Sequence, residues 1–477
     1  MGDTTMHQLR RACLATWPDL WPALMFYFSL SFLFELPELA LLQQSRDNAF
    51  TATQYGIVGG LSALPWVIKP VWGWMVDRYA LPLVVWCGAC YVVYAAAFWV
   101  LTMDISIQVF ACAATAVSWS LCFMDVIVDC VTVMHVRDHE AHRDSGTFQT
   151  RIWQLRAVGG LSASLLGGVL TSEVGPTAVL WLCAGLLVPP LVALCRSTKF
   201  VELYNAKRST QTAADVTAVD SSTFSGARSV LAGVCTSELR GMVLFSFLIA
   251  ATPSIGGYLS YFVLEQGVTV MQLTIVEVVD YTARLVGATV WHRYLRGVTY
   301  RKLFAACTIV IVLLKLANFV LVSDWLSENW HYALVAGADG AALCLAAQVL
   351  VLPIMNYVAK SCAAGHEGRT YALAISISNL GGALSVLLGT AIGGSLRVGN
   401  DGDYSSMAAL IAITAALALA PLLAIQLVPQ NITGYTRTES QTQRGASMVT
   451  PVPSTCDIEL TCTAKNPVTS EPDDYKA

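Results

Sequence analysis

The sequence predicts an all-α polytopic membrane protein with twelve transmembrane helices in two pseudo-symmetric halves of six. Three observations predict this fold class. Apolar stretches of about twenty residues recur along the chain, and a helix of that length crosses the hydrocarbon of a bilayer. Of the 477 residues, 55% are hydrophobic and only 13% are charged, whereas soluble domains carry about 25% charged residues. Two sequence motifs also recur at nearly the same spacing.

The apolar stretches define the elements in order. The first half is expected to occupy residues 21–197, with spans 21–43, 55–76, 80–102, 106–134, 147–171 and 177–195. The second half is expected to occupy residues 239–428, with spans 240–263, 270–290, 303–322, 332–358, 369–395 and 405–428. Residues 198–238, rich in Ser, Thr and Ala, predict a flexible cytoplasmic linker. Residues 1–20 are a polar N-terminal segment, and the polar residues 429–477 predict a disordered cytoplasmic tail.

The distribution of basic residues predicts the orientation. Alternate connections hold most of the Lys and Arg residues, among them Arg78, Arg137, Arg143, Arg293, Arg301 and Lys360. The connections on the other side hold little besides Arg46 and Arg397. Because basic connections stay in the cytoplasm, both termini are expected there. The plasma membrane is the expected location, and residues 1–20 lack the apolar core of a signal peptide.

Several function classes find no support in the sequence. The net charge of −4 is spread over loops and tails, so no nucleic-acid partner is expected. Most of the 14 cysteines lie inside apolar runs, and none has the spacing of a zinc site. We find no phosphate-binding glycine loop and no arrangement typical of a nucleophile. The sequence therefore predicts neither an enzyme nor a bound cofactor or metal.

Two motifs indicate an internal repeat. The segment Gly159–Gly167 resembles Gly381–Gly389, 222 positions further on. The segment Lys69–Tyr79 resembles Arg284–Tyr294, 215 positions further on, and this match aligns Lys69 with Arg284. Two matches at similar offsets, on either side of a central linker, are expected of a transporter built from two homologous halves.

One of these segments carries a family resemblance. Residues Leu64–Gly73 (LPWVIKPVWG), followed by Asp77, resemble the second-helix signature of the folate-biopterin transporter family within the major facilitator superfamily. The segments Asp125–Asp129 and Ser376–Ala383 support it. The resemblance implies the major facilitator fold and transport of folates, pterins or S-adenosylmethionine. Many relatives carry an arginine cluster after the aspartate, whereas this chain has Arg78 alone, which leaves the choice among these substrates open.

Charged residues inside the spans are the candidate functional residues, because burying an ion in a membrane is costly. Asp125 and Asp129 lie four positions apart on one helix face, and two carboxylates this close resist carrying charge together. Such a pair suits proton coupling, and it also suits binding the N–H donors of a pterin. The alternative is a structural ion pair with a basic residue of span 147–171.

That span opens with Gln149, Arg151, Gln154 and Arg156. Arg156 lies deeper than Arg151, and its planar guanidinium matches the carboxylates of folate. Arg156 is therefore the first candidate for contact with substrate or with an aspartate. Gln154 is a further substrate-binding candidate, and Arg151 is expected to extend toward the cytosolic surface.

Lys69 and Arg284 are the basic residues at matching positions of the repeat, and both are candidates for substrate binding. Asp280 precedes Arg284 by one turn, so an ion pair within that helix is the alternative. Lys69 has no acid one turn away, and Asp125 or Asp129 is its expected partner.

Two further groups complete the predicted site. Glu35 and Glu38 flank Pro37 in the first span, where a proline interrupts the helix. Glu35 is the candidate for proton coupling, and for Glu38 the alternative is a place at the outer interface of the membrane. The resemblance implies that Asp77 and Arg78 act in gating the cytoplasmic side.

Together, these residues predict a secondary active transporter that carries folate or an unconjugated pterin by alternating access with proton symport. Its partners would be the small-molecule substrate, protons and the lipid bilayer. Arg156 with Arg284 or Lys69 would hold the anionic part of the substrate, and Glu35, Asp125 or Asp129 would take up the proton. Two alternatives remain: a carrier for another metabolite such as S-adenosylmethionine, and a non-transporting membrane sensor or scaffold.

Overall fold

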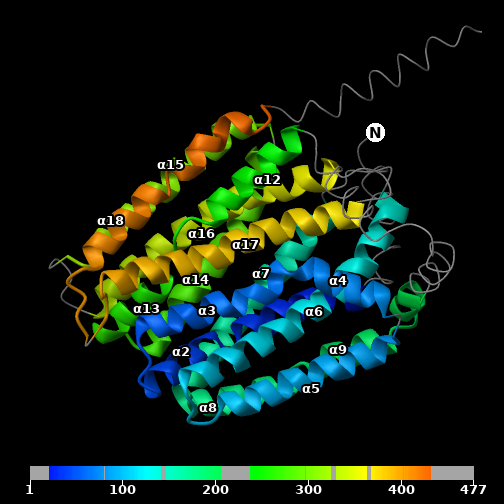
Figure 1. Ribbon diagram of the computed structural model, residues 1–477, viewed down its shortest axis with the longest axis horizontal. Coiled ribbons are helices and arrows are strands. Elements are labelled where there is room, and N and C mark those ends of the chain that lie inside the picture. The colour runs from blue at the N-terminus through cyan, green and yellow to red at the C-terminus, as the bar shows by residue number, and fades with distance from the viewer. Residues whose placement is uncertain are drawn as a thin grey trace, which may run out of the picture. The chain divides into compact units, whose positions relative to one another are not determined.

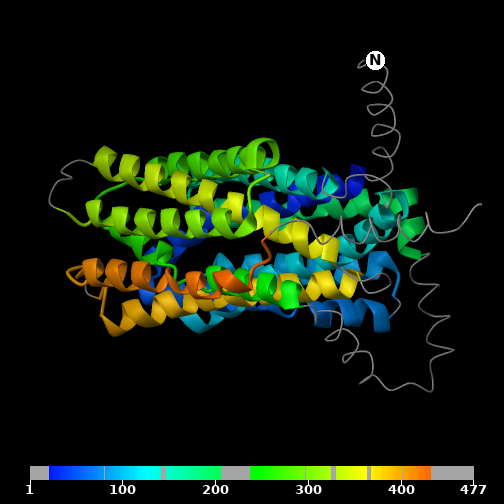
Figure 2. The same cartoon turned by 90° about the horizontal axis from the view of Figure 1, so that it is seen from above.

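The computed structural model describes residues 21–79, 81–140, 147–205, 237–295, 297–323, 329–361, 367–400 and 402–430. The regular elements within these ranges are helices, with one isolated bridge between Asn400 and Asp403. Figure 1 shows the helices lying side by side, and Figure 2 shows from a second direction that their axes stay roughly aligned. The predicted tail beyond residue 430 and residues 206–236 of the predicted linker lie outside the described ranges.

The first half of the chain begins with a helix over residues 21–35. It continues with α2 (Glu38–Asp47), α3 (Ala52–Val67), α4 (Lys69–Arg78), α5 (Leu83–Leu101), α6 (Ile107–Glu140), α7 (Thr147–Val174), α8 (Pro176–Leu186) and α9 (Val188–Arg196). Residues 198–205 are also helical. These eight residues were predicted to belong to the flexible linker. They are ordered because Phe200 and Tyr204 are buried in the first-half core and the Tyr204 hydroxyl donates to the Leu81 carbonyl at 2.9 Å.

The second half of the chain contains a similar series. Its elements are α12 (Ser237–Ala250), α13 (Gly256–Glu265), α14 (Val270–Val290) with the π-helical turn η1 (Trp291–Leu295), α15 (Tyr300–Ala317) with η2 (Asn318–Val320), α16 (Asn329–Ser361), α17 (Glu367–Ser395), and α18 (Met407–Leu417) followed by η3 (Ala420–Leu427).

Within the described ranges, nine helical segments are long and apolar enough to cross a membrane. The chain is therefore an integral, multi-pass membrane protein. Three predicted spans fall outside this set, and each has a physical reason. Span 55–76 is interrupted at Ile68 between α3 and α4, next to Pro70. Span 240–263 is interrupted around Pro253 between α12 and α13. Helix α14, in span 270–290, carries Glu277, Asp280 and Arg284 along its length.

The packing of glycines follows the predicted repeat. A Cβ atom at Gly167 of α7 would overlap the carbonyl oxygen of Leu36, and one at Gly389 of α17 would overlap that of Ser254. These two contacts occupy corresponding places in the two halves. In the first half α7 packs on the first predicted span, and in the second half α17 packs on α12 and α13, which belong to the seventh predicted span. The starts of α3 and α14 also match, because each begins with a Thr–Gln capping box.

The buried apolar residues form three clusters. One lies within the first half of the chain and one mainly within the second. The third joins Leu39, Leu42 and Ala52 to residues of α13 and α18. It lies where the chain turns between α2 and α3 and between α13 and α14, which we call the Arg46 end. At this end, apolar side chains from both halves of the chain pack together.

Candidate functional site

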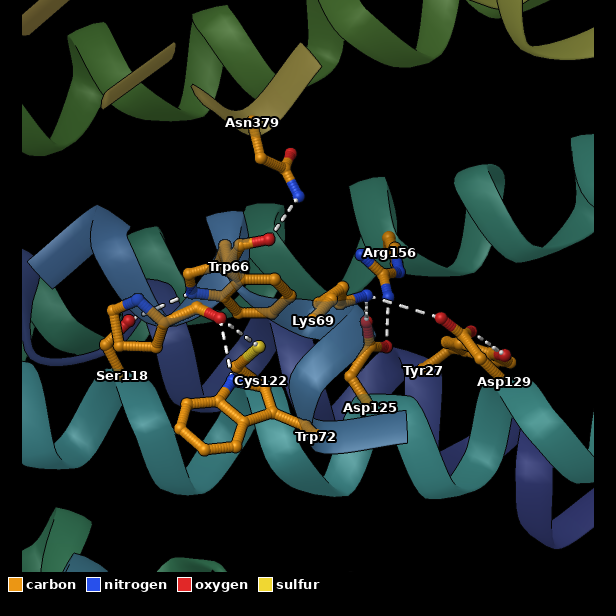
Figure 3. A network of polar contacts seen from close by, with 11 residues as sticks. Tyr27, Trp66, Lys69, Trp72, Ser118, Cys122, Asp125, Asp129, Arg156 and Asn379 are labelled. Carbon is orange, nitrogen blue, oxygen red and sulfur yellow. Dashed lines mark hydrogen bonds and ion pairs between the residues drawn. The ribbon is translucent and has the colours of Figure 1, made fainter. Parts of the chain in front are cut away.

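A cluster of four charged residues joins three helices of the first half of the chain (Figure 3). Lys69 occupies the first position of α4, and Asp125 and Asp129 lie one turn apart on α6. The Lys69 Nζ donates to Asp125 Oδ2, and it lies 3.3 Å from Asp129 Oδ2. Asp125 or Asp129 was the predicted partner of Lys69, and the structure shows contacts with both.

Arg156 of α7 completes the cluster from the other side. Its NH2 group donates to Asp125 Oδ1 at 2.5 Å, so the Asp125 carboxylate lies between two cations. The structural alternative for Asp125, an ion pair with a basic residue of the fifth predicted span, is thus present. Asp129 accepts a hydrogen bond from the Tyr27 hydroxyl at 2.6 Å. Because two positive and two negative charges meet here, the cluster is neutral as a whole, which limits the cost of burying it.

The two aspartates differ in exposure. The side chain of Asp125 is 1% exposed, whereas that of Asp129 is 38% exposed and that of Arg156 is 21% exposed. Asp125 is therefore enclosed and held by both cations. Asp129 keeps an open side, because more than a third of its side chain is exposed.

The interrupted second span supports this cluster. Its free carbonyl groups are satisfied by side chains, since the Trp72 indole donates to the Pro65 carbonyl at 2.9 Å and the Asn379 amide donates to the Trp66 carbonyl at 3.0 Å. The latter bond comes from α17, in the second half of the chain (Figure 3). Such partners are required in a membrane, where water does not reach unpaired backbone groups. The Lys69 ammonium also lies over the Trp66 ring, 5.1 Å from its centroid.

A cavity of about 640 Å³ lies beside the cluster. Residues from both halves of the chain line it. Aromatic and amide side chains form part of the wall, among them Trp66, Trp153, Tyr281, Gln348 and Asn379. Arg156 and Arg284 bring positive charge to the wall, and Glu35 and Glu38 bring negative charge. The volume lies within the range of about 300–1,000 Å³ that is typical of sites for small ligands.

The acids of the first span face α3 and α14. Glu38 accepts a hydrogen bond from the Tyr55 hydroxyl at 3.5 Å. Glu35 lies next to the Tyr281 hydroxyl and close to Arg284. The Arg284 guanidinium in turn lies over the Tyr281 ring, 5.1 Å from its centroid.

Some predicted site residues lie elsewhere. Gln154 does not line the cavity, and its side-chain oxygen accepts from Arg151 NH1 at 3.4 Å in an exposed position. Asp77 and Arg78 are in the last turn of α4, but their side chains lie outside the described part of the structure.

Sequence reasoning missed three residues at the site. Tyr27 contacts Asp129, and Tyr281 contacts both Glu35 and Arg284. Glu277 lies one turn before Tyr281 on the same helix face. An acid inside an apolar span is a visible signal, so Glu277 could have been found. The tyrosines carry no such signal, because a tyrosine in an apolar run is common in any core.

Comparison with known proteins gives family matches over most of the chain. The model of the BT1 family matches residues 43–446. The folate-biopterin transporter of Synechocystis sp. is 26% identical over 394 residues, which cover 78% of this chain and 74% of that protein. The probable folate-biopterin transporter 4 of Arabidopsis thaliana is 26% identical over 205 residues, which cover 41% of this chain and 40% of that protein.

Solved structures show a similar fold. The nucleoside transporter NupG aligns with a TM-score of 0.59 and 12% identity, covering 85% of this chain and 98% of that one. A point mutant of the same transporter aligns with a TM-score of 0.58 and 13% identity, covering 85% of this chain and 99% of that one. At this low identity the likeness concerns the fold alone.

Proposed function

We propose that this chain, which belongs to the BT1 family, is a secondary active transporter that carries folate or an unconjugated pterin by alternating access. The family match and the two relatives confirm the resemblance that residues Leu64–Gly73 predicted. We further propose that its helices form the twelve-helix, two-halved arrangement of the major facilitator fold. The likeness to NupG and the matched glycine contacts of α7 and α17 support that arrangement.

The cavity of about 640 Å³ is the observation that carries this proposal. Its wall offers flat aromatic rings, amide groups and two arginines, and these are the groups that a pteridine ring with an anionic tail would need. Both halves of the chain contribute to it, so a movement of one half against the other would change which side of the membrane the cavity faces.

The charged cluster suggests how protons could be coupled to transport. Asp125 is committed to Lys69 and Arg156, so we propose that these three residues form the fixed part of the site. Asp129 and Glu35 are the proposed proton carriers, because Asp129 has an open side and Glu35 lines the cavity. A proton drives the cycle only if the two states bind it with unequal affinity. Asp77 and Arg78 remain the proposed gating residues of the cytoplasmic side.

The distribution of basic residues supports an orientation with both termini in the cytoplasm. The Arg46 end would then face away from the cytoplasm. We propose the plasma membrane as the location.

The decisive experiment is uptake by the purified protein in proteoliposomes. Labelled folate, biopterin and S-adenosylmethionine are supplied separately, with and without an inward proton gradient. We expect uptake of folate or biopterin that the gradient accelerates. A correctly folded preparation that takes up none of the three would contradict the proposal.

A carrier of a cationic metabolite such as S-adenosylmethionine is the second candidate, and the two acids in the cavity wall favour it. In such a carrier the carboxylates would bind the substrate and the arginines would be structural. The relative cost of Glu38→Gln and Arg284→Gln separates the two cases, because both residues line the cavity. A pteridine carrier should lose more substrate affinity from Arg284→Gln, and a cation carrier more from Glu38→Gln.

A further inference from the structure

Lys69 and Arg284 occupy matching positions of the repeat, yet their surroundings differ in charge. Lys69 contacts the carboxylates of Asp125 and Asp129 on α6. Arg284 contacts the thiol of Cys344 on α16. Cys344 follows Asp125 by 219 positions, which lies between the offsets of 215 and 222 that the sequence repeat gives. Cys344 therefore stands where the first half of the chain has its enclosed aspartate.

The other members of the charged cluster have neutral counterparts as well. Gln348 follows Asp129 by 219 positions, and Ser378 follows Arg156 by 222 positions. Gln348 and Ser378 both line the cavity. The second half of the chain has thus kept one cation of the repeated cluster and replaced its two acids by neutral side chains.

This replacement leaves Arg284 without the carboxylate contact that Lys69 has. Among the described residues, the structure records no ion pair within 4.0 Å that involves Arg284. Asp280, one turn away on α14, has its carboxylate against Gly340 of α16 and near the thiol of Cys344. Arg284 lines the cavity as an exposed residue and rests on the Tyr281 ring. Arg156, the other arginine of the wall, is committed to Asp125.

We propose that Arg284 is the residue that binds the carboxylate of an anionic substrate, and that the neutral side chain of Cys344 is what makes this possible. A guanidinium presents a planar pair of donors that matches a carboxylate. A cation inside a membrane protein also needs a partner to be stable there. In the first half of the chain Asp125 meets that need by direct contact. Glu35 lies close to Arg284 but is not within the 4.0 Å of an ion pair, so the donors of Arg284 stay available to the carboxylate of the substrate. This inference rests on the proposed function, because it assumes that the cavity is a transport site.

The test restores the missing acid. In Cys344→Asp the new carboxylate would neutralise Arg284 as Asp125 neutralises Lys69, and Cys344→Asn is the matched control of equal size without charge. Uptake of folate, which carries two carboxylates, is compared in proteoliposomes with uptake of biopterin, which carries none. We expect Cys344→Asp to lower the folate-to-biopterin ratio of kcat/KM by roughly 10- to 100-fold, the scale of a lost charge-assisted contact. Cys344→Asn should leave that ratio unchanged.

A second pair of variants locates the anion site independently. Arg284→Gln should lower folate uptake selectively. Arg156→Gln should lower the uptake of both compounds alike, because it leaves Asp125 with one cation fewer. The inference is overturned if Arg156→Gln is the selective variant, if the Asp and Asn variants of Cys344 change the ratio equally, or if folate is not carried while biopterin is. Uptake of neither compound by the unmodified protein would instead overturn the proposed function, and this inference with it.

Discussion

Asp125 illustrates how a single residue holds several helices together. Its carboxylate accepts from Lys69 of α4 and Arg156 of α7 while it is itself 1% exposed. Removing one member of a buried ion pair typically costs about 3–5 kcal/mol, because the remaining charge stays buried without compensation. Here two cations would lose their shared partner.

We therefore predict that Asp125→Asn lowers the unfolding free energy by about 3 kcal/mol or more. The measurement is denaturant-induced or thermal unfolding of the detergent-solubilised protein. Asp129→Asn is the control, since substitution of the more exposed Asp129 should lower the unfolding free energy by less. The double variant Asp125→Asn with Lys69→Met should recover part of the loss. Equal stability of the Asp125 and Asp129 variants would show that the contacts of Asp125 with Lys69 and Arg156 do not stabilise the fold.

A second prediction at the residue scale concerns coupling. Asp129 contacts Lys69 and Tyr27 but keeps an open side, so it can exchange a proton while Asp125 stays paired. Asp129→Asn should abolish the dependence of uptake on a proton gradient before it abolishes substrate binding. Counterflow exchange, which needs no net proton movement, should persist in this variant. If binding and gradient dependence fell together, Asp129 would belong to the substrate site or to the fold.

The sequence predicted the charged residues of the site, because a charged residue inside an apolar span is easy to recognise. A lysine inside an apolar span without an acid one turn away needs a partner on another helix, and this led to the contact of Lys69 with Asp125. The sequence could not tell that Arg156 would be held by Asp125 while Arg284 is not. That difference depends on which side chains of α6 and α16 come opposite each arginine, and such contacts arise only when the helices pack.

At the scale of elements, the sequence predicted the apolar helices and the break next to Pro37. It predicted continuous spans over residues 55–76 and 240–263, which the structure interrupts next to Pro70 and Pro253, where proline lacks the N–H that a continuous helix needs. It could not predict that residues 198–205 continue as a helix, because Phe200 and Tyr204 gain their stability from the core that they enter. The glycine repeat was visible as a pattern. Its purpose, close contact between helix backbones, became clear only from the structure.

This close contact gives a prediction for one helix pair. A methyl group at Gly389 of α17 would overlap the carbonyl oxygen of Ser254, whose backbone cannot yield as a flexible side chain does. We expect Gly389→Ala to lower the unfolding free energy by about 1–3 kcal/mol, as overpacking usually does. Gly88→Ala in α5 is the matched control, since a Cβ there meets nothing within 4 Å. Thermal unfolding of both variants checks the expectation, and equal midpoints would show that α17 can move away from Ser254 freely.

At the scale of the whole described chain, several polar contacts join the two halves at the Arg46 end. The hydroxyl oxygens of Ser45 and Tyr261 lie 2.7 Å apart, and the hydroxyl oxygens of Thr53 and Tyr258 lie 2.8 Å apart. Arg46 and Glu265 form an ion pair at 3.2 Å. The apolar cluster that includes Leu42 and Ala52 lies beside them. If the protein works by alternating access, these contacts must separate in each cycle.

The last prediction tests whether the two tyrosine hydroxyls keep this end closed. Leu42→Cys places a thiol in the apolar cluster, and Met103→Cys places one in the exposed turn at the same end as a control. Both are made in a background where the exposed Cys112 is replaced by Ser. Tyr258→Phe and Tyr261→Phe remove the two hydroxyl contacts that join the halves. Their loss should shift the equilibrium toward the open state by about 1–3 kcal/mol.

That shift corresponds to a roughly 5- to 150-fold change in population. A membrane-impermeant maleimide should therefore label Leu42→Cys several-fold faster in the double Phe background, while the labelling of Met103→Cys stays the same. Addition of the transported substrate should change the labelling rate of Leu42→Cys and leave that of Met103→Cys the same, because a ligand shifts the populations of states that bind it unequally. If the rate at Leu42→Cys did not change, the apolar cluster and the Arg46–Glu265 ion pair would be sufficient to hold this end closed without the tyrosine hydroxyls.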